Sequence, residues 1–317
     1  MIISRTKNQQ SPETIRRITE HCFAPRTMTA YTELGEGYFN AAYLVALSDG
    51  TEVVLKVAPK ADVRVMTYEK NIMHSEVSAM RLAKQDPDIP VPAILGWDDS
   101  CTLCDAPYFF MEKLPGQSLN AIKSTLSAEQ IRNIYIDSGR INRRINEIAC
   151  PCFGYPGQPA YQGDRWFPVF RKMMETGIAD AKAGNVPLTV DPEELLRALD
   201  ADAALFDAVT EPKLVHWDLW DGNIFVQDGS ITGLIDWERC IWGDPLLEAG
   251  FRMYGLNPDF LSGYGITMTA QEERRALWYD VYQTLLMSLE CGYRQYETMD
   301  FYNWSSGLLE KQFEKLL

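Results

Sequence analysis

Three polar residues in one stretch of the chain have side-chain types and a spacing that could do chemistry together. Asp218 follows the apolar pair Leu214-Val215, Asn223 comes five residues later, and Asp236 comes thirteen residues after Asn223. Two carboxylates and an amide oxygen form a hard donor set, which suits Mg²⁺ better than zinc. In phosphoryl transfer, one Asp positions and deprotonates the acceptor hydroxyl, while an Asn and a second Asp hold Mg²⁺ on the nucleotide.

A hairpin is expected to bring these side chains together. Residues 224–226 read as a short buried strand, Asp228-Gly229 is a hairpin turn signal, and residues 231–235 form the return strand. The return strand delivers Asp236 to its end, beside the start of the hairpin. The sequence therefore predicts that the two aspartates and the asparagine meet at one end of this hairpin.

The motifs around these residues resemble those of a known family. H-W-D-L-W-D-G-N matches the H-x-D-x-x-x-x-N catalytic loop, and I-D-W-E at 235–238 stands where a kinase carries D-F-G. On these motifs the chain resembles the aminoglycoside phosphotransferase family, relatives of choline and methylthioribose kinases that share the protein-kinase fold. The resemblance implies an α+β, bilobal protein-kinase-like fold, with Asp218 as the catalytic base and Asn223 and Asp236 as the metal ligands. It also implies ATP as the cofactor, with GTP as the alternative, together with Mg²⁺.

The chain departs from the family pattern at three positions. Trp217 replaces the small or basic residue usual between the His and the Asp, and Asp221 stands where proline is common. Asn146 lies near the place where many members have histidine. None of these positions is an expected base or metal ligand. Within the motifs, His216 is expected to brace the loop backbone, and Glu238 either assists the metal or is a surface carboxylate.

The N-terminal region reads as strands joined by a glycine turn. Strand-like runs at 31–34, 43–47 and 53–57 are separated by Gly35-Glu36-Gly37 and by a second turn. A dinucleotide-binding glycine turn must open a helix, whereas a strand follows this one, so dinucleotide binding is disfavoured. Gly35 and Gly37 fit a kinase phosphate lid, and Lys56 fits the phosphate-binding lysine of the strand that follows.

Two glutamates are candidate partners for Lys56. Glu69 and Glu76 both flank the apolar stripe of a helix expected over residues 62–85, roughly 10 Å apart along its axis. The family arrangement favours Glu76, and Glu69 is the alternative. Because a lysine that serves phosphate is not needed for packing, Lys56→Ala is expected to lower activity and leave the melting temperature nearly unchanged.

The pattern changes from strands to helices near residue 114, after two strands expected between residues 94 and 112. The resemblance places a hinge here, which divides the chain into an N-terminal nucleotide-binding lobe, 1–113, and a C-terminal catalytic and substrate-binding lobe, 114–317. The adenine ring would bind backbone groups from Glu112 to Leu114. Helices are expected at about 12–23, 128–148, 166–183, 192–209, 270–292 and 297–317.

Composition narrows the class of partner. The net charge of −14 argues against nucleic acid, because phosphate-backbone binding requires clustered Lys and Arg. No apolar run is long enough to cross a membrane, and seven cysteines without a secretion signal indicate reduced thiols, so a cytoplasmic protein is expected. The pairs Cys101/Cys104 and Cys150/Cys152 are too far apart for zinc to be favoured. The oligomeric state is not encoded in these features.

The catalytic motifs leave the acceptor open. A small molecule with a hydroxyl group is expected, and acids beside aromatic residues suit a cationic, aminoglycoside-like molecule through ion pairs and cation–π contact. These acids, in segments expected to reach Asp218, are Asp164, Glu272, Glu273, Glu290, Glu297 and Asp300. Choline, homoserine and sugar metabolites are alternative acceptors. A nucleotide-binding, pseudokinase-like regulator is the alternative from another class.

Overall fold

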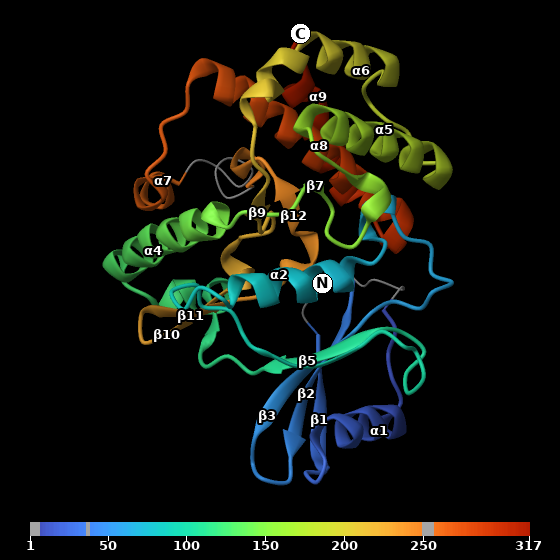
Figure 1. Cartoon of the computed structure of the whole chain (residues 1–317), viewed down its shortest axis with the longest axis vertical. Helices are drawn as coiled ribbons and strands as arrows, with labels where there is room; N and C mark the ends of the chain where they lie inside the picture. The colour runs from blue at the N-terminus through green and yellow to red at the C-terminus, as the bar shows by residue number, and fades with distance from the viewer. Residues whose placement is uncertain (1–6, 36–38, 249–256) are drawn as a thin grey trace.

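The computed structural model describes residues 7–35, 39–248 and 257–317. A five-stranded antiparallel sheet lies at one end of the molecule, and most of the helices lie at the other (Figure 1). The strand order is β1-β2-β3-β5-β4, with bounds β1 Met28–Leu34, β2 Ala41–Leu47, β3 Glu52–Val57, β4 Ile94–Asp98 and β5 Tyr108–Glu112. This arrangement confirms the expected α+β fold with an antiparallel sheet and a larger helical part.

The central strand β3 is almost wholly buried. Val53, Leu55 and Val57 are at most 1% exposed, as expected of a strand with neighbours on both sides. Lys56 lies in this strand, paired in register with residues of β2 and β5. Helix α1, Pro12–Phe23, begins where the Ser11 hydroxyl accepts a hydrogen bond from the backbone N–H of Thr14 at 3.1 Å.

The helix expected over 62–85 is shorter than predicted. A 3-10 turn, Thr67–Glu69, comes first, and α2 spans only Ile72–Ala83. Between them, Asn71 takes a left-handed conformation with φ 56°, which ends the turn and starts the helix in a new direction. Glu69 and Glu76 therefore belong to different elements, and the prediction of one continuous helix was wrong.

The helical part follows the expected order. Its helices are α3 Leu119–Ile122, α4 Ala128–Glu147, α5 Trp166–Gly184, α6 Pro192–Ala201, α7 Pro258–Tyr264, α8 Ala270–Arg294 and α9 Asp300–Glu314. Helix α6 ends earlier than predicted, because residues 203–208 form a 3-10 turn instead, and α7 was not predicted. Helices α4 and α7 approach closely at Gly139, where an added Cβ would lie 2.1 Å from the carbonyl oxygen of Phe260. Only glycine fits at that contact.

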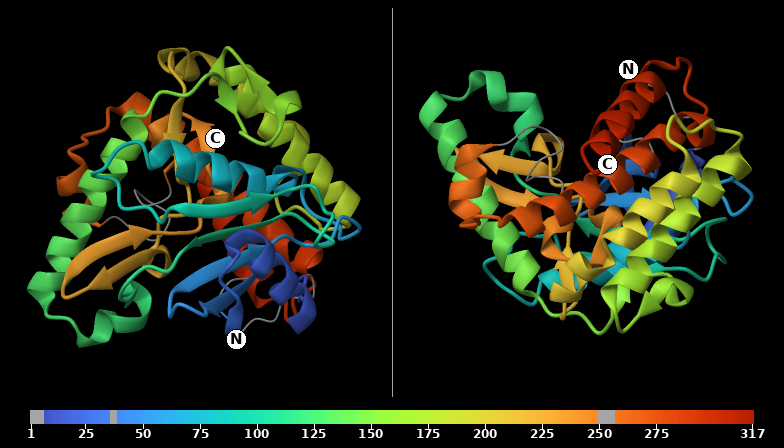
Figure 2. Two further views of the ribbon diagram at one scale, coloured as in Figure 1. Left: turned by 60° about the horizontal axis from the view of Figure 1, so that its bottom comes forward. Right: turned by 90° about the horizontal axis from the view of Figure 1, so that it is seen from above.

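Two small sheets carry the stretch with the polar residues. One has the order β11-β10-β6, with bounds β6 Gln117–Ser118, β10 Ile224–Gln227 and β11 Ser230–Leu234. The other has the order β8-β7-β12-β9, with bounds β7 Phe153–Gly154, β8 Gln162–Gly163, β9 Lys213–Val215 and β12 Ile241–Gly243. Figure 2 shows the β10–β11 hairpin beside the segment of α3 and α4. Asp228 and Gly229 both have positive φ, so the predicted hairpin turn is confirmed.

No helix in the described ranges is both long and apolar enough to cross a membrane.

Candidate active site

The catalytic-loop residues lie between β9 and β10. Asn223 ends a 3-10 turn, Asp221–Asn223, and its Nδ2 donates to the backbone oxygen of Asp218 at 2.8 Å and to the Asp218 Oδ2 at 3.1 Å. Since both bonds use the nitrogen, the Asn223 amide oxygen is the atom left for a cation. The structure thus brings the expected base and the first expected metal ligand together.

Lys56 connects this site to the five-stranded sheet. Its ammonium donates to Glu76 Oε1 and to Asp236 Oδ1, each at 2.6 Å. The Lys56 and Glu76 side chains are 8% and 1% exposed, whereas Asp236 is 32% exposed. Burial by itself would lower the pKa of Lys56, but the charges of Asp236 and Glu76 outweigh it and raise that pKa above its usual value. Lys56 is therefore charged and also holds a buried ion pair together.

The alternative partner, Glu69, is engaged elsewhere. Its Oε1 accepts from Arg294 at 2.9 Å, and its Oε2 accepts from the backbone N–H of Met66 at 2.8 Å. In this structure the Lys56 ammonium pairs with the helix α2 glutamate and not with Glu69.

Asp236 leaves strand β11 in a left-handed conformation with φ 60°. The residue before it, Ile235, donates its N–H to the Asn223 carbonyl at 3.0 Å, which holds the end of the hairpin against the catalytic loop. The Ile235 carbonyl in turn lies 3.0 Å from His216 Nε2. Although burial opposes its charged form, the Lys56 ammonium holds the pKa of Asp236 below its usual value.

His216 braces the loop in the structure. Its Nδ1 accepts the N–H of Asp218 at 3.3 Å, so Nε2 is the nitrogen that donates to Ile235. Burial lowers the pKa of His216 to about 4, and the ring is therefore neutral at pH 7. Burial also raises the pKa of Asp218 to about 7, with Arg239 opposing and Asp236 adding to the rise. A carboxylate with this pKa is suited to accept a proton near neutral pH.

Glu248 is a site residue that the sequence reasoning missed. Its fully buried carboxylate accepts the N–H groups of His216 at 3.2 Å and Trp217 at 2.9 Å, and the amide of Asn142 at 2.9 Å. Trp217 has φ 66°, a conformation that costs a residue with a side chain roughly 1–2 kcal/mol. The bonds to Glu248 help to hold the loop in that conformation. Burial raises the pKa of Glu248 to about 7.

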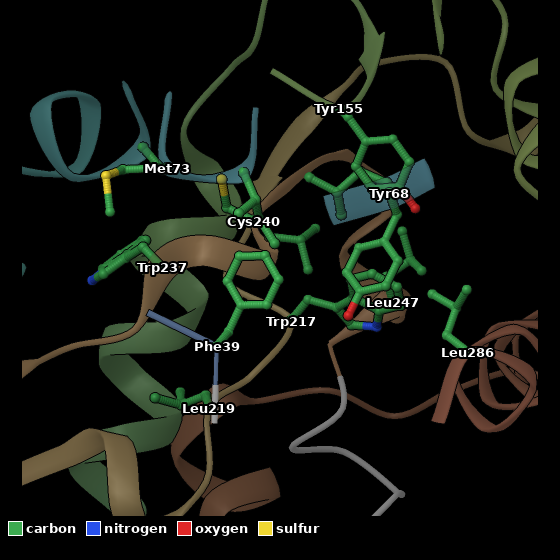
Figure 3. Close-up of a cluster of buried hydrophobic side chains, with 14 of the residues drawn as sticks. Phe39, Tyr68, Met73, Tyr155, Trp217, Leu219, Trp237, Cys240, Leu247 and Leu286 are labelled. Atoms are coloured by element: carbon green, nitrogen blue, oxygen red, sulfur yellow. The ribbon is translucent and has the colours of Figure 1, made fainter. Parts of the chain in front are cut away.

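The Trp217 side chain belongs to an aromatic cluster and not to the loop surface. It stacks on Tyr282 with centroids 5.7 Å apart and meets the ring of Tyr68 edge-on at 6.4 Å. Figure 3 shows it among Phe39, Tyr68 and Leu247. The indole is 1% exposed, so this departure from the family pattern serves packing.

The structure describes only part of the glycine turn that was expected to form the phosphate lid. Gly37 lies outside the described residues, and a Cβ added at Gly35 would meet nothing within 4 Å. Asn40, beyond the glycine turn, donates to Glu238 Oε2 at 2.8 Å. Glu238 is half-buried and bonded to Asn40, so it is not a freely exposed surface carboxylate. Burial, followed by the charge of Asp236, raises the pKa of Glu238 to about 8.

Glu112 and Leu114, the residues expected at the hinge (the linker between the two parts of the chain), contact the elements on either side of that linker. Glu112 ends β5, and its carboxylate accepts the backbone N–H of Ala93 at 2.8 Å. Leu114 packs on Gly233 in β11, where a Cβ would lie 2.4 Å from the leucine side chain. The linker therefore packs against the strand that delivers Asp236.

The acids considered for a cationic acceptor are dispersed. Asp164, Glu273, Glu297 and Asp300 are exposed, and Glu272 caps α8 by accepting from Thr269. Glu290 alone of these is buried, and its carboxylate pairs with Arg239 at 2.6 Å and Arg294 at 3.4 Å. The acid in this set whose charge acts on Asp218 is thus already paired with arginines.

The donor set at the site fits Mg²⁺. Asn223 offers an amide oxygen and Asp236 a partly exposed carboxylate, and Mg²⁺ usually completes its shell with water and phosphate oxygens. In the part of the chain that the structure describes, no group of three or more His, Cys, Asp or Glu side chains is arranged to hold a metal ion. All seven cysteines are free thiols.

Sequence comparison finds related proteins. The phosphotransferase enzyme family APH matches residues 30–278. A subtelomeric hrmA-associated cluster protein of Aspergillus fumigatus is 26% identical over 124 residues, which cover 38% of this chain and 23% of that protein. The clavilactone A biosynthesis cluster protein Y of Ampulloclitocybe clavipes is 27% identical over 246 residues, covering 67% of this chain and 61% of that protein. The match spans less than two thirds of the length of either relative.

Comparison with solved structures finds the same fold. A structure named as a fructosamine-3-kinase of Thermobifida fusca has 17% identity and a TM-score of 0.70, covering 95% of this chain and 99% of that one. A thermostable mutant of aminoglycoside phosphotransferase APH(4)-Ia, in complex with AMP-PNP and hygromycin B, has 17% identity and a TM-score of 0.63, covering 95% and 98%. At these identities the similarity establishes the fold alone.

Proposed function

The chain belongs to the phosphotransferase enzyme family, and from this premise we propose that it transfers the γ-phosphate of ATP to a hydroxyl group of a small polar molecule. The family match over residues 30–278 supports phosphoryl transfer as the reaction, and a hydroxyl group of a small molecule is the proposed acceptor. The observation that carries the proposal is a set of two bonded pairs, Lys56 with Asp236 at 2.6 Å and Asn223 with Asp218 at 3.1 Å. The backbone bond from the Ile235 N–H to the Asn223 carbonyl, at 3.0 Å, joins the segments that carry the two pairs. A structural ion pair would not require an amide and a second carboxylate beside it.

Each residue has a role in the proposed transfer. Asp218 accepts the proton of the acceptor hydroxyl as that oxygen bonds to the γ-phosphorus and the bond to the ADP oxygen breaks. Lys56 donates to phosphate oxygens, and Glu76 fixes the direction of its ammonium. Asn223 and Asp236 would hold Mg²⁺, which when bound neutralises charge on the phosphates.

The nucleotide is proposed to lie between the two parts of the chain. Residues 1–113 would form the nucleotide-binding lobe, with Gly35 and Gly37 over the phosphates and the backbone from Glu112 to Leu114 beside the base. Residues 114–317 would supply the base and the acceptor site. The packing of the linker on β11 supports this arrangement, because the same strand leads to Asp236.

For the acceptor, we propose a neutral, hydroxyl-rich compound ahead of a polycation. The acid among those considered whose charge reaches Asp218 is Glu290, which pairs with Arg239 and also with Arg294, an arginine that it shares with Glu69. A cationic acceptor that used Glu290 would have to displace these arginines. Sugars should therefore be phosphorylated faster than aminoglycosides such as hygromycin B.

The test is an ADP-release screen with Mg²⁺, ATP and a panel of sugars, aminoglycosides, choline and homoserine. With the best acceptor, Asp218→Asn should lower turnover by about 10² or more, since a positioned base contributes roughly 10²–10⁴. Asp228→Asn is the matched control, because Asp228 is exposed in the hairpin turn and asparagine tolerates its left-handed conformation. Nucleotide binding without turnover on the whole panel would instead indicate a pseudokinase-like regulator.

A further inference from the structure

Two side chains from outside the catalytic loop bind the carboxylate of Asp221. Lys123 Nζ donates to its Oδ2 at 2.7 Å, and the hydroxyl of Tyr135 lies 2.9 and 3.0 Å from its two oxygens. Lys123 also donates to the Tyr135 hydroxyl, so the three groups form a closed triangle. Lys123 lies in the 3-10 turn after α3 and Tyr135 lies on α4, so the triangle ties the loop to two other elements.

Asp221 stands at a position of the loop that a proline could occupy. Asp221 is the first residue of the 3-10 turn, and its N–H has no hydrogen-bond partner in the described ranges. Trp220 before it has φ −121° and ψ 171°, the extended conformation that precedes proline. Proline restricts φ by its ring and is favoured at the first position of a helical turn. Here no ring restricts the turn.

We propose that Asp221 is a positioning residue, and that its bonds to Lys123 and Tyr135 restrict the turn in place of a proline ring. The turn ends at Asn223, whose side chain bonds back to Asp218. A shift of the turn would therefore move the proposed metal ligand relative to the proposed base. A misplacement of about 1 Å costs roughly 10²-fold in rate at a site of this kind.

If Asp221 served only the stability of the fold, its loss would lower the melting temperature, but its ion pair is too exposed for that. The Lys123 side chain is 42% exposed and that of Asp221 is 22% exposed, and an ion pair as open as this contributes little to global stability. Loss of the triangle should therefore leave the melting temperature nearly unchanged and act on the loop alone. Proline at position 221 should replace the restriction without replacing any bond.

The first test is hydrogen exchange of the peptide covering residues 216–226, which needs no assumption about function. The N–H groups of Trp220 and Asn223 are the reporters, because they donate to backbone oxygens within the loop at 3.1 and 2.9 Å. Asp221→Ala should speed their exchange at least about tenfold, and Asp221→Pro should return it to within about threefold of wild type. Asp137→Ala, which removes an exposed pair with Arg140 on α4, is the control and should change nothing.

The second test is kinetic and rests on the proposed function. With the best acceptor, Asp221→Ala should lower kcat about 10- to 100-fold with little change in the acceptor KM, and Asp221→Pro should restore kcat to within about threefold. Tyr135→Phe, which removes one bond of the triangle, should lower kcat by less. An alanine variant with wild-type exchange, or a proline variant as impaired as alanine, would overturn the proposal. If wild type turns over no acceptor, the proposed function fails, while the exchange result still decides the role of Asp221.

Discussion

Replacing Lys56 by Met should destabilise the protein as well as inactivate it. The ammonium lies 2.6 Å from Glu76, and the Glu76 side chain is 1% exposed. In the variant this carboxylate would keep its charge at pH 7 without its partner, or take up a proton at a cost in free energy. The expectation that loss of Lys56 leaves the melting temperature unchanged treats the lysine as a phosphate ligand alone, and the buried pair contradicts it.

The magnitude follows from burial. Removing one partner of a buried ion pair costs about 3–5 kcal/mol. Asp236, the second partner, is 32% exposed and can be solvated, and Met keeps the aliphatic stem beside Phe109, so a value near the lower limit is expected. At roughly 2–4 °C per kcal/mol, about 3 kcal/mol lowers the melting temperature by roughly 6–12 °C.

Thermal unfolding of a set of variants tests this reasoning. The double variant Lys56→Met/Glu76→Gln should regain most of the loss, because no charge is then left buried alone. Lys60→Met is the matched control, since Lys60 is 54% exposed and pairs with Asp105 at 3.2 Å, and it should shift the melting temperature by only about 1–2 °C. A wild-type melting temperature for Lys56→Met, or a double variant no more stable than the single one, would refute the argument.

Three further predictions concern the metal, pH and packing. Calorimetric titration should show that Mg²⁺ tightens ATP binding to wild type and not to Asn223→Ala; equal tightening in both would remove Asn223 as a ligand. The pKa of Glu248 is raised to about 7 from 4.5, so the native state holds this proton more tightly than the unfolded state does. The contribution of Glu248 to the free energy of unfolding is thus complete below pH 4.5 and falls as pH rises through 7. In urea unfolding between about pH 5 and 8, the free energy of unfolding of Glu248→Gln should decline less steeply with pH than that of wild type. Parallel profiles for the two proteins would count against this. Gly139→Ala should destabilise the protein by roughly 1–3 kcal/mol, because the added Cβ would meet the Phe260 carbonyl. Gly307→Ala, in open space on α9, is the control and should be neutral or stabilise by up to about 1 kcal/mol. Similar melting temperatures for the two variants would show that α4 and α7 separate freely.

Local rules were sufficient to predict the hairpin in the stretch that carries the candidate site residues. The turn at Asp228-Gly229 and the alternation of the flanking strands predicted the hairpin correctly, because turn conformation and strand pairing over a few residues depend on neighbours in the chain. Of the three side chains predicted to meet, Asp218 and Asn223 bond at 3.1 Å, and the Ile235 N–H, which precedes Asp236, bonds to the Asn223 carbonyl at 3.0 Å. The starts of the helices expected at about 12, 128 and 270 were correct for the same reason, since each helix begins after a cap, Ser11, Ser127 or Thr269, that bonds to an N–H group within three residues.

The partners of the buried charges were decided by the tertiary structure. Glu69 and Glu76 look alike in the sequence, but a left-handed residue at Asn71 separates them, and packing brings Arg294 to one and Lys56 to the other. Glu248 gave no signal, because it binds backbone N–H groups about thirty residues away, and backbone groups are the same at every position. Whether an acidic side chain is solvated, neutralised or free to act depends on which distant elements pack against it, and that depends on how the whole chain buries its apolar surface.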